Sequence, residues 1–303
     1  INAFNLHFLL YFCIYNKKGM DLTFTNSKSN TKNIKKFMQS QANRILENNK
    51  MHSIDRKQLH KRDKLKNHPS VIPLNVYQTW TSKSLPIKMQ QNVLRLKSEN
   101  PEFKFHLFDD VDCRKFITDN FHDLVVKCYD KIIPGAYKAD LWRLCILYIN
   151  GGIYMDIKLN CINGFKLIYL TKSEHFVQDR PRSLCRIPIY NAFLACKPKN
   201  PFILAAIYEI VENIQKKFYG DCWLSVSGPV LLGKLALKHN KQLPIDMEHH
   251  RTSERCGCGF IRYNKMDIMR TEYPEYSGER KTIYDKINLQ HYGQMWREKK
   301  VYK

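Results

Sequence analysis

Regular patterns of apolar and polar residues begin only after residue 68 of this 303-residue chain. Residues 74–80 form a run that is typical of a strand, and residues 85–99 have the pattern of a helix that ends before a proline. Residues 103–108 alternate apolar and polar side chains, which predicts a half-buried strand. We therefore expect a folded domain over residues 69–303, preceded by an extension over residues 1–68.

The clearest single element is a helix expected over residues 136–148. Its apolar residues recur at the spacing of one helical face: Leu141, Leu144, Cys145 and Tyr148. Gly151-Gly152 follow, and glycine ends a helix at little cost because it readily adopts the left-handed conformation. Residues 153–155 then have the composition of a strand. This places Asp156 at the carboxyl end of that strand.

Two more helices are expected in the second half of the chain. Asn200-Pro201 is a strong helix start, because asparagine caps the helix and proline fits the first helical position. That helix should run to about Tyr219, and a second helix should follow Ser227-Gly228-Pro229. Residues 241–285 have a loop-rich pattern with short strands. Strands that alternate with helices predict an α/β fold with a mostly parallel central sheet.

The net charge is large and uneven. Fifty Lys and Arg residues against 28 Asp and Glu residues give +22, which favours acidic partners such as nucleic acid, anionic membranes or phosphate-bearing ligands. Much of the excess lies in residues 16–70, so we interpret residues 1–68 as a basic N-terminal extension, partly disordered or helical. Because no recognition helix, RNA-binding sheet signature or finger spacing accompanies the charge, no specific nucleic-acid partner is expected.

Residues 3–15 are apolar, but the segment is shorter than the roughly twenty residues that a bilayer-spanning helix needs. One interpretation is the remnant of a signal-anchor, followed by Lys17-Lys18, that associates the protein with a secretory membrane through its N-terminus. The other is that translation starts at Met20 and the apolar segment is not native. A cytoplasmic and a membrane-associated protein both remain open.

The ten cysteines give no firm metal or disulfide signature. Seven of them lie among apolar positions and are expected to be buried free thiols: Cys113, Cys128, Cys145, Cys161, Cys185, Cys196 and Cys222. Cys256 and Cys258 form a C-x-C downstream of His249 and His250. Loop cysteines, a disulfide-related role and a zinc site stay open for them, although zinc sites more often use two wider-spaced pairs.

Asp156 is placed where ligands bind in open α/β sheets, outside the carboxyl end of a strand. The two glycines before its strand would let the backbone approach a diphosphate closely. Departure of a diphosphate is helped by a divalent cation held by carboxylates, or by Lys and Arg. Asp140 and Arg143 share one face of the preceding helix, and Lys138 lies near the same end. These residues suit a sugar hydroxyl and a phosphate, and a surface ion pair is the alternative.

Several segments, taken in order, point to one family. They are Ile72-Pro73 with Tyr77-Gln78-Thr79-Trp80, then Ala139-Asp140-Leu141-Trp142-Arg143 with Leu147-Tyr148, then Gly151-Gly152-Ile153-Tyr154-Met155-Asp156, Asn191-Ala192-Phe193-Leu194-Ala195-Cys196-Lys197-Pro198, and Ser227-Gly228-Pro229. Together they resemble the DXD-containing sugar transferases of glycosyltransferase family 32. The resemblance covers roughly residues 70–235, with a weaker similarity at His291 and Trp296.

The resemblance implies a GT-A-like (Rossmann-like) fold, a UDP- or GDP-sugar donor and retention of the anomeric configuration. It implies that Asp140 and Arg143 contact the donor sugar and diphosphate, and that Asp156 is the first acid of the DXD motif. Further donor-binding residues are implied: Tyr77, Gln78, Thr79, Trp80, Lys138, Gly151, Gly152, Tyr154, Asn191 and Trp296. Tyr77 and Trp80 would lie on the nucleobase side, with a core position as the alternative for Trp80.

The chain departs from the family pattern at Lys158, because the motif reads Asp156-Ile157-Lys158. In related enzymes the second acid is a principal metal ligand. Lys158 could point away and leave Asp156 and His291 to hold Mn²⁺ or Mg²⁺. It could instead neutralise the diphosphate itself and make the metal partly or wholly dispensable. Loss of catalysis is the third explanation. For His291, a structural role in the aromatic tail is the alternative.

The predicted function is the transfer of a hexose, with retention, from a nucleotide-diphosphate sugar to the hydroxyl of a glycan, lipid or protein acceptor. We expect the catalytic residues to be Asp140, Arg143, Asp156 and Lys158, with Asp179 on the acceptor side. The alternative, motivated by Lys158, is a non-catalytic relic that binds nucleotide-sugar or carbohydrate.

Overall fold

The computed structural model describes residues 70–181, 185, 187–238, 243–251, 259–286 and 290–303. The predictions for the basic extension, its apolar segment, and Cys256 and Cys258 lie outside these residues. Within the described part of the chain, no helix is both long and apolar enough to cross a membrane. The seven cysteines expected to be free thiols are free, and all but Cys222 are buried.

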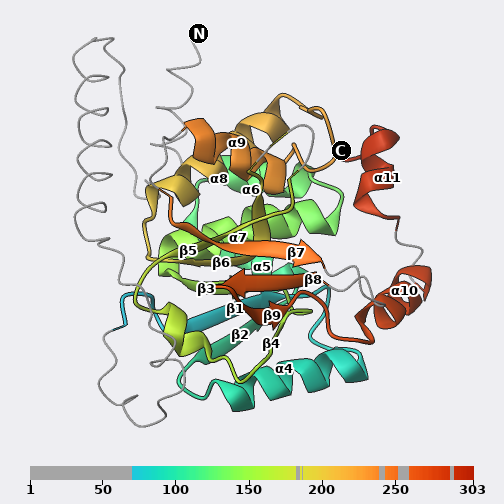
Figure 1. The fold of residues 1–303 in the computed structure, drawn as a ribbon. Helices are drawn as coiled ribbons and strands as arrows, with labels where there is room; N and C mark the ends of the chain where they lie inside the picture. The colour runs from blue at the N-terminus through green and yellow to red at the C-terminus, as the bar shows by residue number, and fades with distance from the viewer. Residues whose placement is uncertain (1–69, 182–184, 186, 239–242, 252–258, 287–289) are drawn as a thin grey trace, which may run out of the picture.

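One sheet of nine strands organises the described residues, in the order β2-β1-β3-β6-β5-β7-β8-β9-β4 (Figure 1). The strands are β1 (Asn75–Thr79), β2 (Lys104–Phe108), β3 (Gly152–Met155), β4 (Asn160–Cys161), β5 (His175–Gln178), β6 (Ile189–Cys196), β7 (Ile245–Arg251), β8 (Gly259–Tyr263) and β9 (Met266–Arg270). The predicted α/β class is confirmed. The sheet is parallel at β2-β1-β3 and at β5-β7, and its other pairings are antiparallel, so it is mixed rather than mostly parallel.

Helices cover both faces of this sheet. A layer on one face comprises α5 (Asp110–Asn120), α6 (Asp123–Lys131), α7 (Gly135–Asn150), α8 (Pro201–Gln215) and α9 (Pro229–Lys238), and α4 (Ile87–Glu99) lies on the other face (Figure 1). Neighbouring residues of one strand point to opposite faces. Tyr154 therefore packs in the core under the helical layer, whereas Ile153 and Met155 pack in the core of the opposite face.

The helix expected over residues 136–148 is confirmed as α7, which is buried along most of its length. The helix expected from Pro201 is α8, and Asn200 caps it by accepting hydrogen bonds from the backbone N–H groups of Phe202 and Ile203. The short strands expected within residues 241–285 are confirmed as β7, β8 and β9, whereas the helix α10 (Tyr276–Lys286) was not expected in this loop-rich stretch. Its strands pair with one another across the sheet, and such pairing is not visible in a local pattern. A short helix, α11 (Tyr292–Arg297), follows.

The sheet curls so that its last strand returns to the loop after β3. β4 begins four residues after Asp156 and pairs with β9, where Asn160 lies opposite Arg270. The backbone N–H of Tyr273 then donates to the carbonyl of Lys158. The segments that follow β3 and β9 are therefore neighbours, and the curl closes a hollow at this edge of the sheet.

Candidate active site

The predicted site residues gather at one edge of the sheet because of strand direction. β6 runs antiparallel to β3 and β5, so its first half lies beside the carboxyl ends of both. The backbone N–H of Asp156 donates to the carbonyl of Ala192 at 2.8 Å. α7 ends where β3 begins, so the first half of α7, with Asp140 and Arg143, lies above the carboxyl end of β3.

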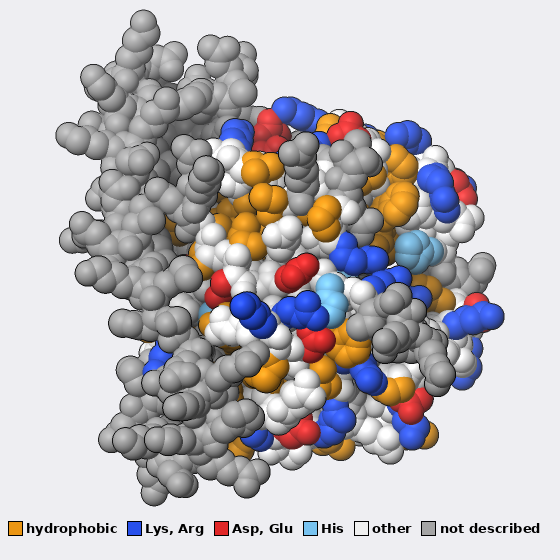
Figure 2. Space-filling view, in the orientation of Figure 1, with side chains coloured by type: hydrophobic (Ala, Val, Ile, Leu, Met, Phe, Trp, Pro, Cys, Tyr) orange, Lys and Arg blue, Asp and Glu red, His pale blue; other side chains and the backbone are white. Residues whose placement is uncertain are grey.

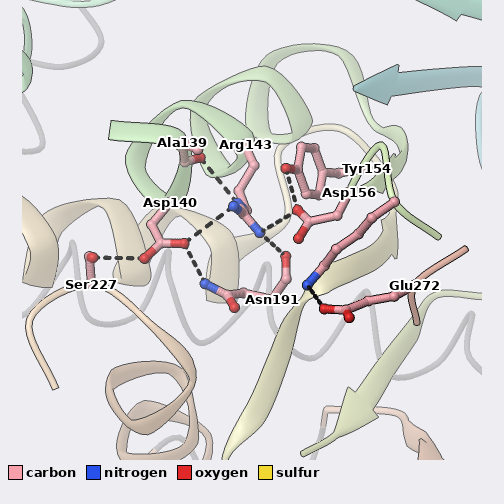
Figure 3. Close-up of polar contacts among 9 residues, drawn as sticks. Ala139, Asp140, Arg143, Tyr154, Asp156, Asn191, Ser227 and Glu272 are labelled. Atoms are coloured by element: carbon pink, nitrogen blue, oxygen red, sulfur yellow. Dashed lines mark hydrogen bonds and ion pairs between the residues drawn. The ribbon is translucent and has the colours of Figure 1, made fainter. Parts of the chain in front are cut away.

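Asp140, Arg143 and Asp156 form a continuous chain of charges (Figure 3). Nη2 of Arg143 lies 3.4 Å from Oδ1 of Asp140, and its Nη1 lies 3.3 Å from Oδ1 of Asp156. The side chains of Asp140 and Arg143 are about nine-tenths buried, whereas that of Asp156 is 25% exposed. The surface ion pair considered from the spacing alone is therefore excluded, because both partners are internal.

The guanidinium of Arg143 is held on several sides. Its Nε donates to the carbonyl of Ala139 at 3.1 Å, and its Nη1 donates to the carbonyl of Asn191. Its central carbon lies 4.4 Å from the centroid of the Tyr154 ring, and the Tyr154 hydroxyl donates to Asp156 at 2.7 Å. Arg143 and Tyr154 thus fix the orientation of Asp156 before any ligand arrives.

Asp140 is the most deeply enclosed of the acids. It accepts hydrogen bonds from Nδ2 of Asn191 at 2.6 Å and from the hydroxyl of Ser227 at 2.8 Å. Burial raises the pKa of Asp140 to about 7, although Arg143 and these two donors oppose the rise. A carboxyl with this pKa can hold or release a proton near neutral pH.

Lys158 lies in the site and not away from it. Its ammonium is 3.2 Å from Glu272 and 5.4 Å from the centroid of the Tyr276 ring. Burial alone would lower the pKa of Lys158, but the surrounding Tyr190, Asp156 and Glu272 outweigh burial and raise it. Lys158 therefore presents a permanent positive charge beside Asp156.

Two cavities meet at these residues. The larger, of about 640 Å³, is lined by Asp140 and by Asp179, and the smaller, of about 220 Å³, by Thr79 and Trp80. Arg143, Asp156 and Lys158 line both. A ligand with a charged centre and two extended ends would fit this arrangement.

The first-strand segment divides between the cavity wall and the core. Thr79 and Trp80 line the smaller cavity, and Trp80 also packs against a small core cluster under α4. Tyr77 and Gln78 line neither cavity and are buried. The Tyr77 ring stacks on His106 with 5.1 Å between centroids. Tyr77 and Gln78 therefore support the wall from behind.

Gly151 and Gly152 lie at the start of β3, whereas Asp156 follows its other end. The backbone conformation and the neighbouring chain explain why both residues are glycine. Gly151 and Gly152 have φ of 62° and 101°. A Cβ on Gly151 would lie 2.6 Å from Pro198, and one on Gly152 would lie 2.8 Å from the carbonyl of Asn75. The expected close approach is therefore to neighbouring chain segments, and neither glycine lines a cavity.

Two other predicted donor-binding residues lie outside both cavities. The Nζ of Lys138 lies 5.2 Å from the centroid of the Tyr129 ring. The Lys138 residue lines a separate surface hollow beside α5. The Trp296 indole donates to the carbonyl of Tyr219 at 2.7 Å and packs edge-on to Trp223. Trp296 thereby fastens α11 to the segment between α8 and α9.

His291 lines the larger cavity and also caps α11. Its Nδ1 accepts a hydrogen bond from the backbone N–H of Gly293 at 3.1 Å. Burial, with Arg280 and Arg297 nearby, lowers the pKa of His291, so the ring is neutral at pH 7. Only its Nε2 remains for a ligand.

The side chains at this site fit a resident divalent metal poorly. Among the described residues, no group of three His, Cys, Asp or Glu side chains could hold a metal ion. One oxygen of Asp156 is already bound by Tyr154 and faces Arg143, and Lys158 stands at the position of the second acid. Mn²⁺ and Mg²⁺ require oxygen ligands. Lys158 instead supplies a fixed cation.

Asp179 lies farther along the same wall, directly after β5. It accepts hydrogen bonds from Nδ1 of His249 at 2.7 Å and from the backbone N–H of Arg180 at 2.8 Å. The prediction from sequence missed His249 and Glu272 as site residues. Both come from the pairing of β7, β8 and β9, and no local sequence signal marks that pairing.

Comparisons with known proteins agree with the predicted family. Residues 86–173 match the family model described as "Glycosyltransferase sugar-binding region containing DXD motif". The Schizosaccharomyces pombe protein named inositol phosphoceramide mannosyltransferase 1 is 26% identical over 53% of this chain and 50% of its own length. The uncharacterized glycosyltransferase L373 of Acanthamoeba polyphaga mimivirus is 34% identical over 30% of this chain and 37% of its own length. The chain thus spans half the length of these relatives or less.

A similar solved structure is the PaToxG glycosyltransferase, with 17% identity over 69% of this chain and 78% of that chain and a TM-score of 0.46. The match to the family model does not depend on this structural similarity. The predicted resemblance to DXD-type sugar transferases is therefore confirmed for residues 86–173.

Proposed function

We propose that this chain is a glycosyltransferase that moves a hexose from a nucleotide-diphosphate sugar to an acceptor hydroxyl, with retention of the anomeric configuration. The observation that supports this most is the buried chain Asp140–Arg143–Asp156, which opens on both cavities with Lys158 beside it. Acids and bases held in this way suit a sugar with several hydroxyls joined to a diphosphate.

In the proposed reaction the bond between the anomeric carbon and the diphosphate breaks, and a bond to the acceptor oxygen forms on the same face of the sugar. The acceptor's proton passes to the departing diphosphate. Lys158 neutralises charge that grows on the diphosphate, and a positioned cation of this kind stabilises the transition state. Asp140 and Asp156 bind sugar hydroxyls, and Arg143 holds both acids in place.

The smaller cavity would take the nucleoside, because Trp80 and Thr79 lie on its wall and the shared residues separate it from the larger cavity. The larger cavity would then hold the hexose and the acceptor. Since the S. pombe relative is named a mannosyltransferase, mannose is the first hexose to test. Glycan, lipid and protein acceptors are all compatible with a cavity of about 640 Å³.

The test is turnover of a panel of donors, including GDP-mannose, UDP-glucose and UDP-galactose, measured as nucleoside diphosphate released. We expect one donor to be turned over, and Asp156→Asn to reduce its turnover sharply. Asp130→Asn is the matched control, because Asp130 forms an exposed ion pair with Arg114 away from both cavities. Equal turnover in the Asp156→Asn variant and the wild type would refute the assignment.

A non-catalytic relic that binds nucleotide-sugar is the second candidate, and Lys158 at the position of the second acid is the observation that favours it. Saturable donor binding with no turnover of any donor, with or without Mn²⁺, would establish it.

Metal use is tested in the same assay. If Lys158 supplies the cation, turnover persists in EDTA and is lost in Lys158→Met. Turnover that EDTA abolishes and Mn²⁺ restores would refute this role for Lys158.

A further inference from the structure

Trp223 is an exposed aromatic residue on the wall of the larger cavity. It is 36% exposed and lines the larger cavity but not the smaller one. Exposed hydrophobic side chains are ordinary on protein surfaces, and Figure 2 shows such side chains (orange) scattered among charged ones. Phe218 and Leu237 are more exposed than Trp223, yet they line neither cavity. Trp223 is therefore distinguished by its place beside the proposed site.

The indole of Trp223 is held in place by α11. It packs edge-on against the Trp296 ring, with 6.3 Å between the centroids and 73° between the planes. Gly293 lies beside it, because a Cβ built at Gly293 would contact Cδ2 of Trp223 at 3.7 Å. The rest of the indole surface remains exposed on the cavity wall. A ring fixed in this way loses little conformational entropy when a ligand binds to it.

The backbone around Trp223 is fixed as well. The carbonyl of Trp223 accepts a hydrogen bond from the hydroxyl of Tyr137 at 2.6 Å. Three residues later, the carbonyl of Val226 accepts a hydrogen bond from Nδ2 of the buried Asn213 at 3.0 Å. Tyr137 belongs to α7 and Asn213 to α8. The two bonds therefore tie this segment to two helices of the layer that covers the sheet.

The same segment connects Trp223 to the buried acid of the site. Ser227, four residues after Trp223, donates to Asp140 at 2.8 Å. Tyr137 lies three residues before Asp140, so their side chains share one face of α7. Trp223, Tyr137 and Asp140 all line the larger cavity. This part of the cavity therefore combines an exposed aromatic surface with a carboxyl group.

An aromatic surface beside a carboxyl group suits a pyranose ring. The C–H groups on one face of such a ring are weakly positive, and they pack on the negative face of an indole. The hydroxyls at the edge of the ring need hydrogen-bond partners, which carboxyl and amide groups supply. An acyclic polyol carries similar hydroxyls but has no flat C–H face. It therefore gains much less from an aromatic surface.

We infer that Trp223 is the platform on which a pyranose ring of the acceptor stacks, which makes the acceptor a carbohydrate or a molecule that carries one. The inference rests on the proposed function, in which the diphosphate lies beside Lys158 and the nucleoside lies in the smaller cavity. Because Trp223 lines only the larger cavity, its ring is available to the acceptor. The inference disfavours the hydroxyl of a protein side chain as the acceptor.

Calorimetric titration of the full chain, with GDP and separately with UDP at saturation, tests the platform with pairs of ligands. Each pair is a methyl pyranoside of mannose, glucose or galactose and the matching acyclic polyol, namely mannitol, sorbitol or galactitol. We expect at least one pyranoside to bind roughly tenfold more tightly than its polyol, because only the ring can stack. Trp223→Leu should abolish this preference. Trp223→Phe should keep most of it, because phenylalanine retains an aromatic face.

Phe218→Leu is the matched control, because Phe218 is 41% exposed, lies five residues before Trp223 and lines neither cavity. This variant should keep the preference of the wild type. The affinity for the nucleoside diphosphate, measured on the same variants, separates a binding role from a structural one. It should be unchanged in Trp223→Leu, whereas the affinity for the pyranoside falls.

The inference is overturned if no pyranoside binds more tightly than its polyol, or if the preference survives in Trp223→Leu. Equal losses in Trp223→Phe and Trp223→Leu, a loss in Phe218→Leu, or equal weakening of the nucleoside diphosphate and the pyranoside in Trp223→Leu also overturn it. Failure of the proposed function has a different signature. No donor is then turned over, whereas binding of a pyranoside that depends on Trp223 persists.

Discussion

Asp140→Asn tests whether burial raises the pKa of Asp140 in the folded chain, and whether its charge contributes to donor turnover. The substitution preserves the volume of the side chain and removes its charge. Asn191 and Ser227 keep a polar partner, because an amide can accept one hydrogen bond and donate another. Arg143 keeps Asp156 as an acidic neighbour.

The magnitude follows from the pKa of Asp140, which is about 7 in the folded chain against the usual 3.8. The folded state therefore binds one proton more than the unfolded state between these two pH values. Stability must fall as pH rises through that window, by about 1.4 kcal/mol per pH unit. The whole effect is about 4 kcal/mol, and it is complete only above the folded pKa.

The assay is denaturant unfolding of the wild type and the variant at a series of pH values. The free energy of unfolding of the wild type, relative to the variant, should decrease by about 2 kcal/mol between about pH 5 and about pH 7. Donor turnover of the wild type should rise as the pH passes through about 7, as Asp140 ionises. In the variant, turnover should be lower by about tenfold or more, because a charge-assisted contact to the sugar is lost.

Parallel stability profiles of the two proteins would refute the reasoning, since they would show that Asp140 keeps an ordinary pKa in the folded chain. Asp130→Asn is the control for a general effect of removing one negative charge, because that side chain is 38% exposed and paired on the surface.

Three further predictions concern residues whose role the structure changed. Gly152→Ala should destabilise the fold by about 1–3 kcal/mol in denaturant unfolding, because φ is 101° and the new Cβ would lie 2.8 Å from the carbonyl of Asn75; unchanged stability would contradict this. Lys138→Ala should leave kcat/KM for the donor unchanged, because Lys138 lines neither cavity. A tenfold decrease in kcat/KM would show that Lys138 does contact the donor. His291→Ala should cost about 1 kcal/mol by removing the cap on Gly293, and His291→Asn should restore stability but not donor affinity; full recovery of affinity would make His291 purely structural.

The sequence by itself determined the elements whose signals are local. The helical periodicity before Gly151 predicted α7, and Asn200-Pro201 predicted the start of α8. A helix forms hydrogen bonds within about four residues, so its caps and its apolar face can be recognised in the chain. The ordered motifs also pointed to the family whose model matches residues 86–173, and to Asp140, Arg143 and Asp156, which the structure brings together.

Only the tertiary structure decided which distant residues complete the site. Asn191 and Ser227 reach Asp140 across 51 and 87 residues, and Glu272 reaches Lys158 across 114. Such contacts depend on strand order and register, which are set by pairing across the whole sheet and leave little trace in a local pattern. For the same reason His249 and Glu272 were not assigned to the site from sequence, and Gly151 and Gly152, assigned from sequence to the ligand, instead pack against Pro198 and Asn75.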